Sequence, residues 1–177
     1  MKAEKTRSIQ HWLKRKCAFL FASFLFSMPA MAGDISVSES VELDVKPAGL
    51  WAFIGDYNSL YRWHPNVKSS VLVGDGTRQG DMRLLILLDG TVIPNELVVM
   101  DNQNMSYTYK SLSSTMPITD YVGTVSVTEN ASGGSTLTWV STFNANEGVK
   151  PEDAQKLVID IYWAAYNYLK ELFHKNN

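Results

Sequence analysis

Residues 151–174 read PEDAQKLVIDIYWAAYNYLKELFH, and this C-terminal stretch decides the fold. A proline followed by two acidic residues is typical of a helix start, because acids favour the positive end of the helix dipole. Apolar side chains then recur at steps of three or four residues, which is the period of one helix face. The stripe consists of Leu157, Ile161, Ala165, Tyr168 and Leu172, flanked by Val158, Tyr162 and Leu169. The stretch predicts one long amphipathic helix of about 24 residues.

The chain before this helix alternates apolar and polar residues as β-strands do. The expected strands are 35–43, 67–73, 82–88, 92–100, 105–112, 121–128 and 136–143, separated by turn signals such as Asp89-Gly90 and Gly133-Gly134. A short helical segment, 48–54, and a second short helix or turn, 56–63, follow the first strand. Pro94 favours an edge, a bulge or a loop, because proline cannot donate a ladder hydrogen bond. This order predicts an α+β domain with one curved antiparallel sheet around the final helix.

The first 32 residues have the three parts of a secretory signal peptide. Residues 1–16 carry six Lys and Arg and one acid, residues 17–27 form an uncharged apolar run, and Ala30 and Ala32 provide small residues before the cleavage point. An uncleaved anchor is the alternative, but the run is shorter than the roughly 20 residues that span a bilayer. We therefore expect residues 1–32 to be a signal peptide, residues 33–177 to form the mature domain, and the destination to be the periplasm of a diderm bacterium. No membrane association is expected after cleavage.

The mature chain is acidic and has no cysteine. After residue 32 there are ten Lys and Arg and 17 Asp and Glu, which give a net charge of −7. This charge disfavours nucleic acid and anionic membrane surfaces, since both need a basic protein surface. Cys17 lies in the leader, so the mature chain can form neither a disulfide nor a thiolate metal site. Its two histidines are too few for a zinc site, and nucleotide-binding motifs are missing, so we expect no metal and no cofactor.

Several motifs, taken together and in order, resemble the START-like (SRPBCC) superfamily and its polyketide cyclase/dehydrase-like branch. They are Trp51-x-x-Ile54-Gly55-Asp56-Tyr57, Trp63-His64-Pro65-x-Val67, Gly80-x-x-Arg83, Asp89-Gly90, Glu96-Leu97, Asp101, Tyr107-x-Tyr109, Pro117, Tyr121 and Trp139-x-x-x-Phe143. The resemblance implies a helix-grip fold, in which a seven-stranded sheet encloses a cavity against the C-terminal helix. It also implies a small hydrophobic or amphipathic ligand. Similar exported proteins are accessories of periplasmic methanol oxidation, so a periplasmic protein partner is a further hypothesis.

The resemblance places the ligand among residues of the strands and of the final helix. The candidates are Lys68, Leu85, Leu87, Glu96, Tyr107, Tyr109, Tyr121, Trp139, Phe143, Leu157, Ile161 and Ala165. A filled core is the other interpretation of the apolar members. The small Ala164-Ala165 pair at mid-helix and the tyrosine hydroxyls, which need partners when buried, favour a cavity.

Polar residues near the expected cavity have more than one interpretation. The resemblance has an acid at Glu96 facing the ligand, where it would serve as acid/base in a cyclase or dehydratase. A structural ion pair or an exposed strand position is also open, and Asn95 could take its place. Lys68 would hold a ligand carboxylate or be a solvated strand lysine. We expect His64 mainly to shape a turn and Arg83 to pair with an acid. Because no catalytic constellation is readable, binding is favoured over catalysis.

Overall fold

The structure, a computed structural model, describes residues 33–113 and 115–174. The expected signal peptide, residues 1–32, and its cleavage point lie outside the described residues. Among the described helices, none is both long and apolar enough to cross a membrane.

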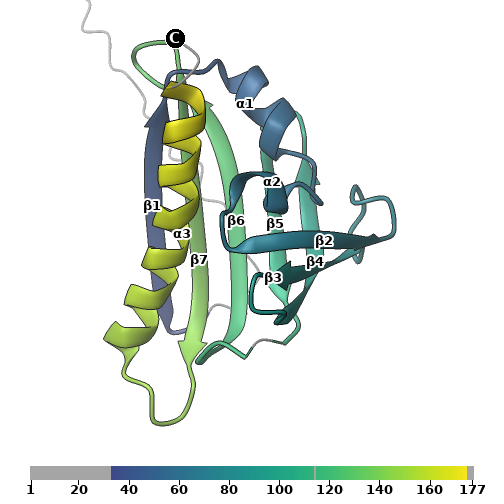
Figure 1. The fold of residues 1–177 in the computed structure, drawn as a ribbon, viewed down its shortest axis with the longest axis vertical. Helices are drawn as coiled ribbons and strands as arrows, with labels where there is room; N and C mark the ends of the chain where they lie inside the picture. Colours follow the sequence, from purple (N-terminus) through teal and green to yellow (C-terminus); the bar gives the residue numbers. More distant parts are fainter. Residues whose placement is uncertain (1–32, 114, 175–177) are drawn as a thin grey trace, which may run out of the picture. The chain divides into compact units, whose positions relative to one another are not determined.

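Seven strands form one antiparallel sheet (Figure 1). They are β1 (Ile35–Leu43), β2 (Val67–Val73), β3 (Met82–Leu87), β4 (Val92–Asp101), β5 (Ser106–Ser111), β6 (Ile118–Glu129) and β7 (Ser135–Ala145). Their order across the sheet is β1-β7-β6-β5-β4-β3-β2, so β1 and β2 are the edges. Two short helices, α1 (Pro47–Ile54) and α2 (Leu60–Trp63), connect these edges. The expected seven-stranded helix-grip fold is confirmed.

The long helix α3 (Pro151–His174) packs against β1 and β7 and also contacts α2. Its most buried positions are Ala154, Val158, Tyr162, Ala165, Tyr166 and Leu169. The buried face is therefore rotated from the expected stripe. Leu157 and Ile161 are only half-buried, and Tyr168 is 40% exposed.

Aromatic side chains fix this rotation of α3. Tyr162 stacks on Trp139 of β7, with ring centroids 4.2 Å apart and ring planes within 9°. The Tyr166 hydroxyl donates to the backbone oxygen of Glu39 in β1 at 2.9 Å. Each tyrosine buries a large ring while its hydroxyl keeps a hydrogen-bond partner. This burial decides which face of α3 packs on the sheet, and the spacing of the apolar residues alone does not show it.

Pro94 lies in an interior strand, so the expectation of an edge, a bulge or a loop is wrong. β4 runs between β3 and β5, and Pro94 faces Leu84 of β3. On the other side, the Pro94 carbonyl accepts from the N–H of Leu112 at 2.9 Å, directly after β5 ends at Ser111. The side of Pro94 that lacks an N–H therefore faces the end of β5, where the absent donor removes at most one terminal hydrogen bond of the ladder.

The segment 56–63, expected to be a short helix or a turn, contains both. Only Leu60–Trp63 is helical. The Asp56 carboxylate accepts from the N–H of Asn58 at 2.9 Å and holds a turn before it. Aspartate side chains that bond to the backbone two residues later favour such turns over a helix.

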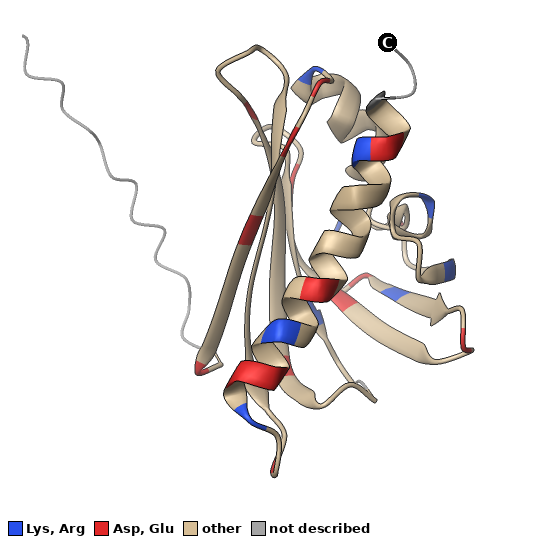
Figure 2. Cartoon of the chain, turned by 60° about the vertical axis from the view of Figure 1, so that its left-hand side comes forward, with Lys and Arg blue, Asp and Glu red and all other residues tan. Residues whose placement is uncertain are grey.

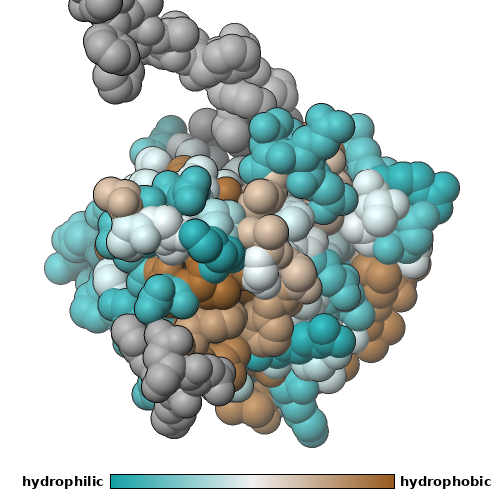
Figure 3. All heavy atoms as spheres, turned by 90° about the horizontal axis from the view of Figure 1, so that it is seen from above, coloured by the Kyte–Doolittle hydropathy of each residue, from teal (hydrophilic) through white to brown (hydrophobic). Residues whose placement is uncertain are grey.

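Some apolar side chains remain on the surface. Val71 and Val73 of β2 and Val92 of β4 are about half exposed, at 49%, 54% and 50%. Figure 3 shows apolar residues near the centre and at the lower right of the face seen from above, with hydrophilic residues beside them. Most large apolar side chains nevertheless pack between the sheet and the helices, where the cavity described next also lies.

Candidate ligand-binding cavity

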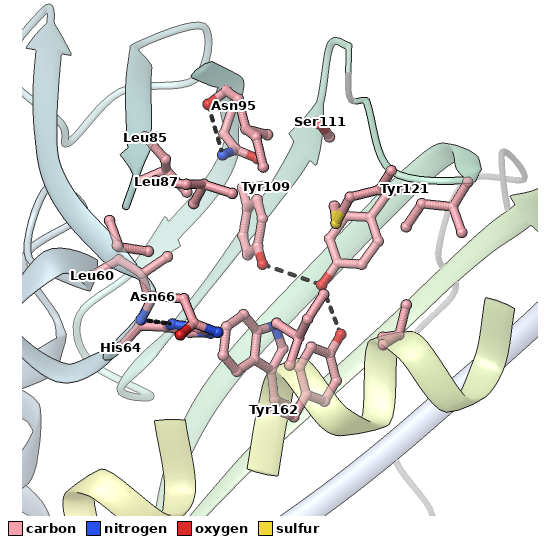
Figure 4. A pocket seen from close by; sticks show the side chains of 17 residues that line it. Leu60, His64, Asn66, Leu85, Leu87, Asn95, Tyr109, Ser111, Tyr121 and Tyr162 are labelled. Atoms are coloured by element: carbon pink, nitrogen blue, oxygen red, sulfur yellow. Dashed lines mark hydrogen bonds between the residues drawn. The ribbon is translucent and has the colours of Figure 1, made fainter. Parts of the chain in front are cut away.

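A cavity of about 130 Å³, here called the main cavity, lies between the sheet, α2 and α3 (Figure 4). Its wall is mostly aliphatic and aromatic, with a few amide, imidazole and hydroxyl groups. The lining residues are Leu60, His64, Asn66, Val67, Leu85, Leu87, Ile93, Asn95, Tyr109, Ser111, Met116, Ile118, Tyr121, Trp139, Val158, Ile161 and Tyr162. A protein cavity of about 150 Å³ can hold benzene. The main cavity therefore has room for a ligand of about one aromatic ring.

A second cavity of about 350 Å³, here called the side cavity, lies beside the connection between β5 and β6. It is lined by Ser111, Leu112, Ser113, Met116, Ile118, Thr119, Asp120 and Tyr121, of which Ser111, Met116, Ile118 and Tyr121 also line the main cavity. These shared walls would let a longer ligand extend from one cavity into the other.

Three tyrosine hydroxyls meet at the main cavity and form a chain (Figure 4). The hydroxyl oxygens of Tyr109 and Tyr121 are 3.2 Å apart, and those of Tyr121 and Tyr162 are 2.6 Å apart. Burial raises the pKa of all three phenols well above the ordinary value of tyrosine. The chain is therefore neutral and fully protonated at physiological pH, and it can donate hydrogen bonds.

His64 lines the cavity from the turn after α2 and is 5% exposed. Its Nδ1 accepts from the N–H of Asn66 at 3.2 Å, as a turn-shaping residue would. Burial lowers its pKa to about 4, although a hydrogen bond with the Ile161 backbone opposes this effect. The turn role expected for His64 is present, but the side chain also joins the turn to α3 and stays uncharged in the cavity wall.

Glu96 does not line the main cavity, so the cavity-facing interpretation is wrong. Its carboxylate pairs with Lys110 of β5 at 3.0 Å on the outer face of the sheet. Because successive strand residues point to opposite faces, the neighbouring Asn95 points inward, and it is 2% exposed. Glu96 is therefore not placed to act as acid or base on a ligand in this cavity. Asn95, the alternative left open by the sequence, lines the wall.

The structure brings only part of the predicted ligand set together. Leu85, Leu87, Tyr109, Tyr121, Trp139 and Ile161 line the main cavity, whereas Lys68, Glu96, Tyr107, Phe143, Leu157 and Ala165 do not. Lys68 is an exposed strand residue, which was the other interpretation of this lysine. Tyr107, Phe143 and Ala165 are buried in the core, and Leu157 lies beside the lining face of α3.

Arg83 is completely buried, but the expected acidic partner is wrong. No salt bridge joins Arg83 to an acid within the part of the chain that the structure describes. Its Nη1 donates to the backbone oxygen of Tyr57 at 2.6 Å. The guanidinium lies 4.4 Å from the ring centroid of Tyr57 and 4.7 Å from that of Tyr109. Aromatic faces therefore take the place of a carboxylate, and Arg83 supports Tyr109 from behind the cavity wall.

Gly123 makes room for the tyrosine chain, and the sequence interpretation missed it. A Cβ atom at this position would lie 2.8 Å from the Tyr121 hydroxyl and 3.0 Å from Cζ of Tyr109. The signal was available, because a glycine inside a strand pattern often marks a close approach of another group.

Replacing Gly123 with alanine should therefore displace the rings of Tyr121 and Tyr109. We expect the free energy of unfolding to fall by about 1–2 kcal/mol, the usual cost of overpacking, as measured by urea denaturation. Gly49→Ala is the control, because its Cβ would meet only Val45, at an ordinary 3.4 Å. Equal stability of Gly123→Ala and the unaltered protein would contradict the close packing described here.

The described residues hold no group of three or more His, Cys, Asp and Glu side chains placed to bind a metal ion.

This fold and site define a helix-grip protein with a cavity between its sheet and its helices. The model of the family described as polyketide cyclase/dehydrase and lipid transport matches residues 34–173. The chain belongs to this family. No match was found among curated proteins.

Three solved structures are similar to this chain. The protein XoxI from Bacillus cereus is 32% identical, with a TM-score of 0.72, over 78% of this chain and 94% of its own. An uncharacterized protein from Bacillus thuringiensis is 31% identical, with a TM-score of 0.73, over 78% and 98%. A protein from Thermobifida fusca is 26% identical, with a TM-score of 0.68, over 79% and 93%.

Proposed function

We propose that the protein binds a small, mostly apolar ligand in the main cavity. The observation that carries this proposal is the cavity of about 130 Å³, apolar over most of its wall and bordered by buried hydroxyls and an amide. Concave, largely apolar sites with a few convergent polar groups are the usual form of small-molecule sites. The family's description, which includes lipid transport, agrees with such a ligand.

Native mass spectrometry of protein purified from its host tests this proposal. We expect a mass above that of the bare chain, and release of a small molecule on denaturation. Ile161→Trp, which replaces an aliphatic side chain of the cavity wall by a large indole ring, should abolish the added mass. Glu96→Gln, on the opposite face of the sheet, should retain it. A bare mass for the unaltered protein, together with no binding in a screen of small aromatic and aliphatic compounds, would contradict the proposal.

We also propose that the protein acts after export, as a mature domain that begins at Gly33. The basic start, the apolar run and Ala30-Met31-Ala32 support this proposal. In the native host, we expect the periplasmic fraction to contain a chain whose first residue is Gly33. N-terminal peptide mapping measures this directly. A cell-associated chain that retains residues 1–32 would show that the leader is an anchor.

A second candidate function is that of an accessory protein with a basic periplasmic partner. The net charge of −7 after residue 32 favours this candidate. Figure 2 shows acidic residues spread over strands, loops and α3, with basic residues between them, and this arrangement marks no single docking face. Capture of a partner that persists unchanged at high salt would count against docking by charge, because salt screens exposed charges.

A further inference from the structure

The tyrosine chain has one proton more than its internal hydrogen bonds use. Each phenol hydroxyl carries one proton. The hydroxyls of Tyr109, Tyr121 and Tyr162 are joined by two hydrogen bonds. Whichever way these bonds run, two of the three protons are used and one remains to donate elsewhere. A buried donor without an acceptor is costly, so the cavity favours an occupant that accepts this proton.

A nearby serine does not change this count. The Ser141 hydroxyl is buried without a hydrogen-bond partner, yet it affects the pKa of Tyr121 and of Tyr162. By its geometry Ser141 is not a member of the chain, so the count of three protons and two hydrogen bonds stands. His64 does not take the proton through Nδ1, because that atom accepts from the N–H of Asn66.

Charged side chains are kept away from the cavity wall. Among the described residues, no Lys, Arg, Asp or Glu lines the main cavity. Glu96 is held on the outer face by Lys110, and Arg83 lies behind the ring of Tyr109. An ionised ligand would lose its hydration and find no opposite charge, which is strongly unfavourable. The cavity therefore disfavours carboxylates and amines in their charged forms.

We propose that the main cavity selects an uncharged ligand of about one ring, with a single carbonyl-type acceptor that takes the spare proton of the Tyr109–Tyr121–Tyr162 chain. This inference rests on the proposed function and adds the chemistry of the ligand. It differs from general apolar binding because it predicts discrimination between molecules of equal size. The Asn95 amide also lines the wall, so the test must separate its contribution from that of the tyrosines.

Three probes with the same number of non-hydrogen atoms provide this test: cumene, acetophenone and benzoate. Their dissociation constants are measured by NMR titration of the protein purified without ligand. The triple variant Tyr109→Phe, Tyr121→Phe and Tyr162→Phe keeps the rings and removes every hydroxyl of the chain. Removing all partners of a buried network in this way leaves no group unsatisfied, so folding should be preserved. Tyr166→Phe, whose hydroxyl bonds to Glu39 outside the cavity, is the matched control.

We expect acetophenone to bind the unaltered protein more tightly than cumene, and benzoate to bind at least tenfold more weakly than acetophenone. The triple variant should lose about tenfold in acetophenone affinity and stay within about threefold for cumene. Tyr166→Phe should change neither value. Should the triple variant fail to fold, the order of the three probes on the unaltered protein still decides the proposal.

The outcomes separate this inference from the proposed function. Binding of cumene with no gain for acetophenone, or benzoate binding as tight as that of acetophenone, would overturn the inference and leave the binding function intact. A preference for acetophenone that survives in the triple variant would also overturn it and would point to Asn95. If none of the probes binds, the inference is contradicted, and the native mass spectrum of the protein from its host decides the proposed function separately.

Discussion

Arg83→Ala is expected to lower the free energy of unfolding by about 3–5 kcal/mol. The side chain is fully buried, so its removal leaves a space in the core. It also removes the hydrogen bond to the backbone oxygen of Tyr57 and the cation–π contacts with Tyr57 and Tyr109. Because the site is fully buried, water cannot replace the lost hydrogen bond or the lost contacts, so the loss of stability should be large for a single residue.

Arg83→Lys should also destabilise the protein, although by less than the alanine variant. An ammonium group is a compact and strongly hydrated charge, whereas the planar guanidinium can lie flat between two rings. Denaturant unfolding measures both variants, with the exposed Arg62→Ala as the control. A change of less than about 1 kcal/mol for Arg83→Ala would show that the tyrosine faces do not stabilise the buried charge. Because Tyr109 rests against Arg83, ligand affinity should fall in the same variants.

The sequence predicted the architecture well because its periodic patterns are local. The helical stripe after Pro151 and the alternating strands identified all seven strands and α3 in the correct order. The bounds of β1 and β2 match the prediction, and the other strands differ at their ends by one to three residues. The prediction for Pro94 was wrong because an interior strand can accept a proline where the neighbouring strand ends, and the sequence does not show where β5 ends relative to Pro94.

The site was only partly predictable, because directions on a sheet depend on pairing. In 92–100 both alternating sets contain apolar residues, so the pattern could not tell whether Glu96 or Asn95 points inward. The ion pair with Lys110 on the neighbouring strand holds Glu96 on the outer face, and this pairing across two strands cannot be read from the residues around Glu96 alone. The same holds for Tyr162, which joins Tyr121 across the cavity and was predicted only as a flank of the helical stripe. Arg83 belongs to one of the sequence motifs, but the motif does not show that the rings of Tyr57 and Tyr109 take the place of an acidic partner.

The protein should lose stability as the pH falls from about 6.5 towards 4, because of His64. Burial lowers the pKa of His64 to about 4 in the folded state, below the ordinary value of 6.5. The unfolded chain therefore binds this proton at a higher pH than the folded chain does. The stabilising contribution is complete above pH 6.5 and is lost as the pH falls to 4. The difference corresponds to about 3 kcal/mol.

The difference in unfolding free energy between the unaltered protein and His64→Gln isolates this effect. Carboxylates titrate alike in both proteins, so their contributions cancel in the difference. Urea denaturation at intervals between pH 7.5 and 4 should show the unaltered protein losing about 3 kcal/mol more than the variant. A glutamine in place of the imidazole cannot become charged, so the stability of the variant should depend less on pH. If the two proteins lose the same stability over this range, His64 takes up its proton without cost in the folded protein, which contradicts a neutral imidazole in the cavity wall.

Ligand affinity should weaken over the same pH range, because a charged imidazole beside Ile161 would disrupt the wall that the ligand contacts.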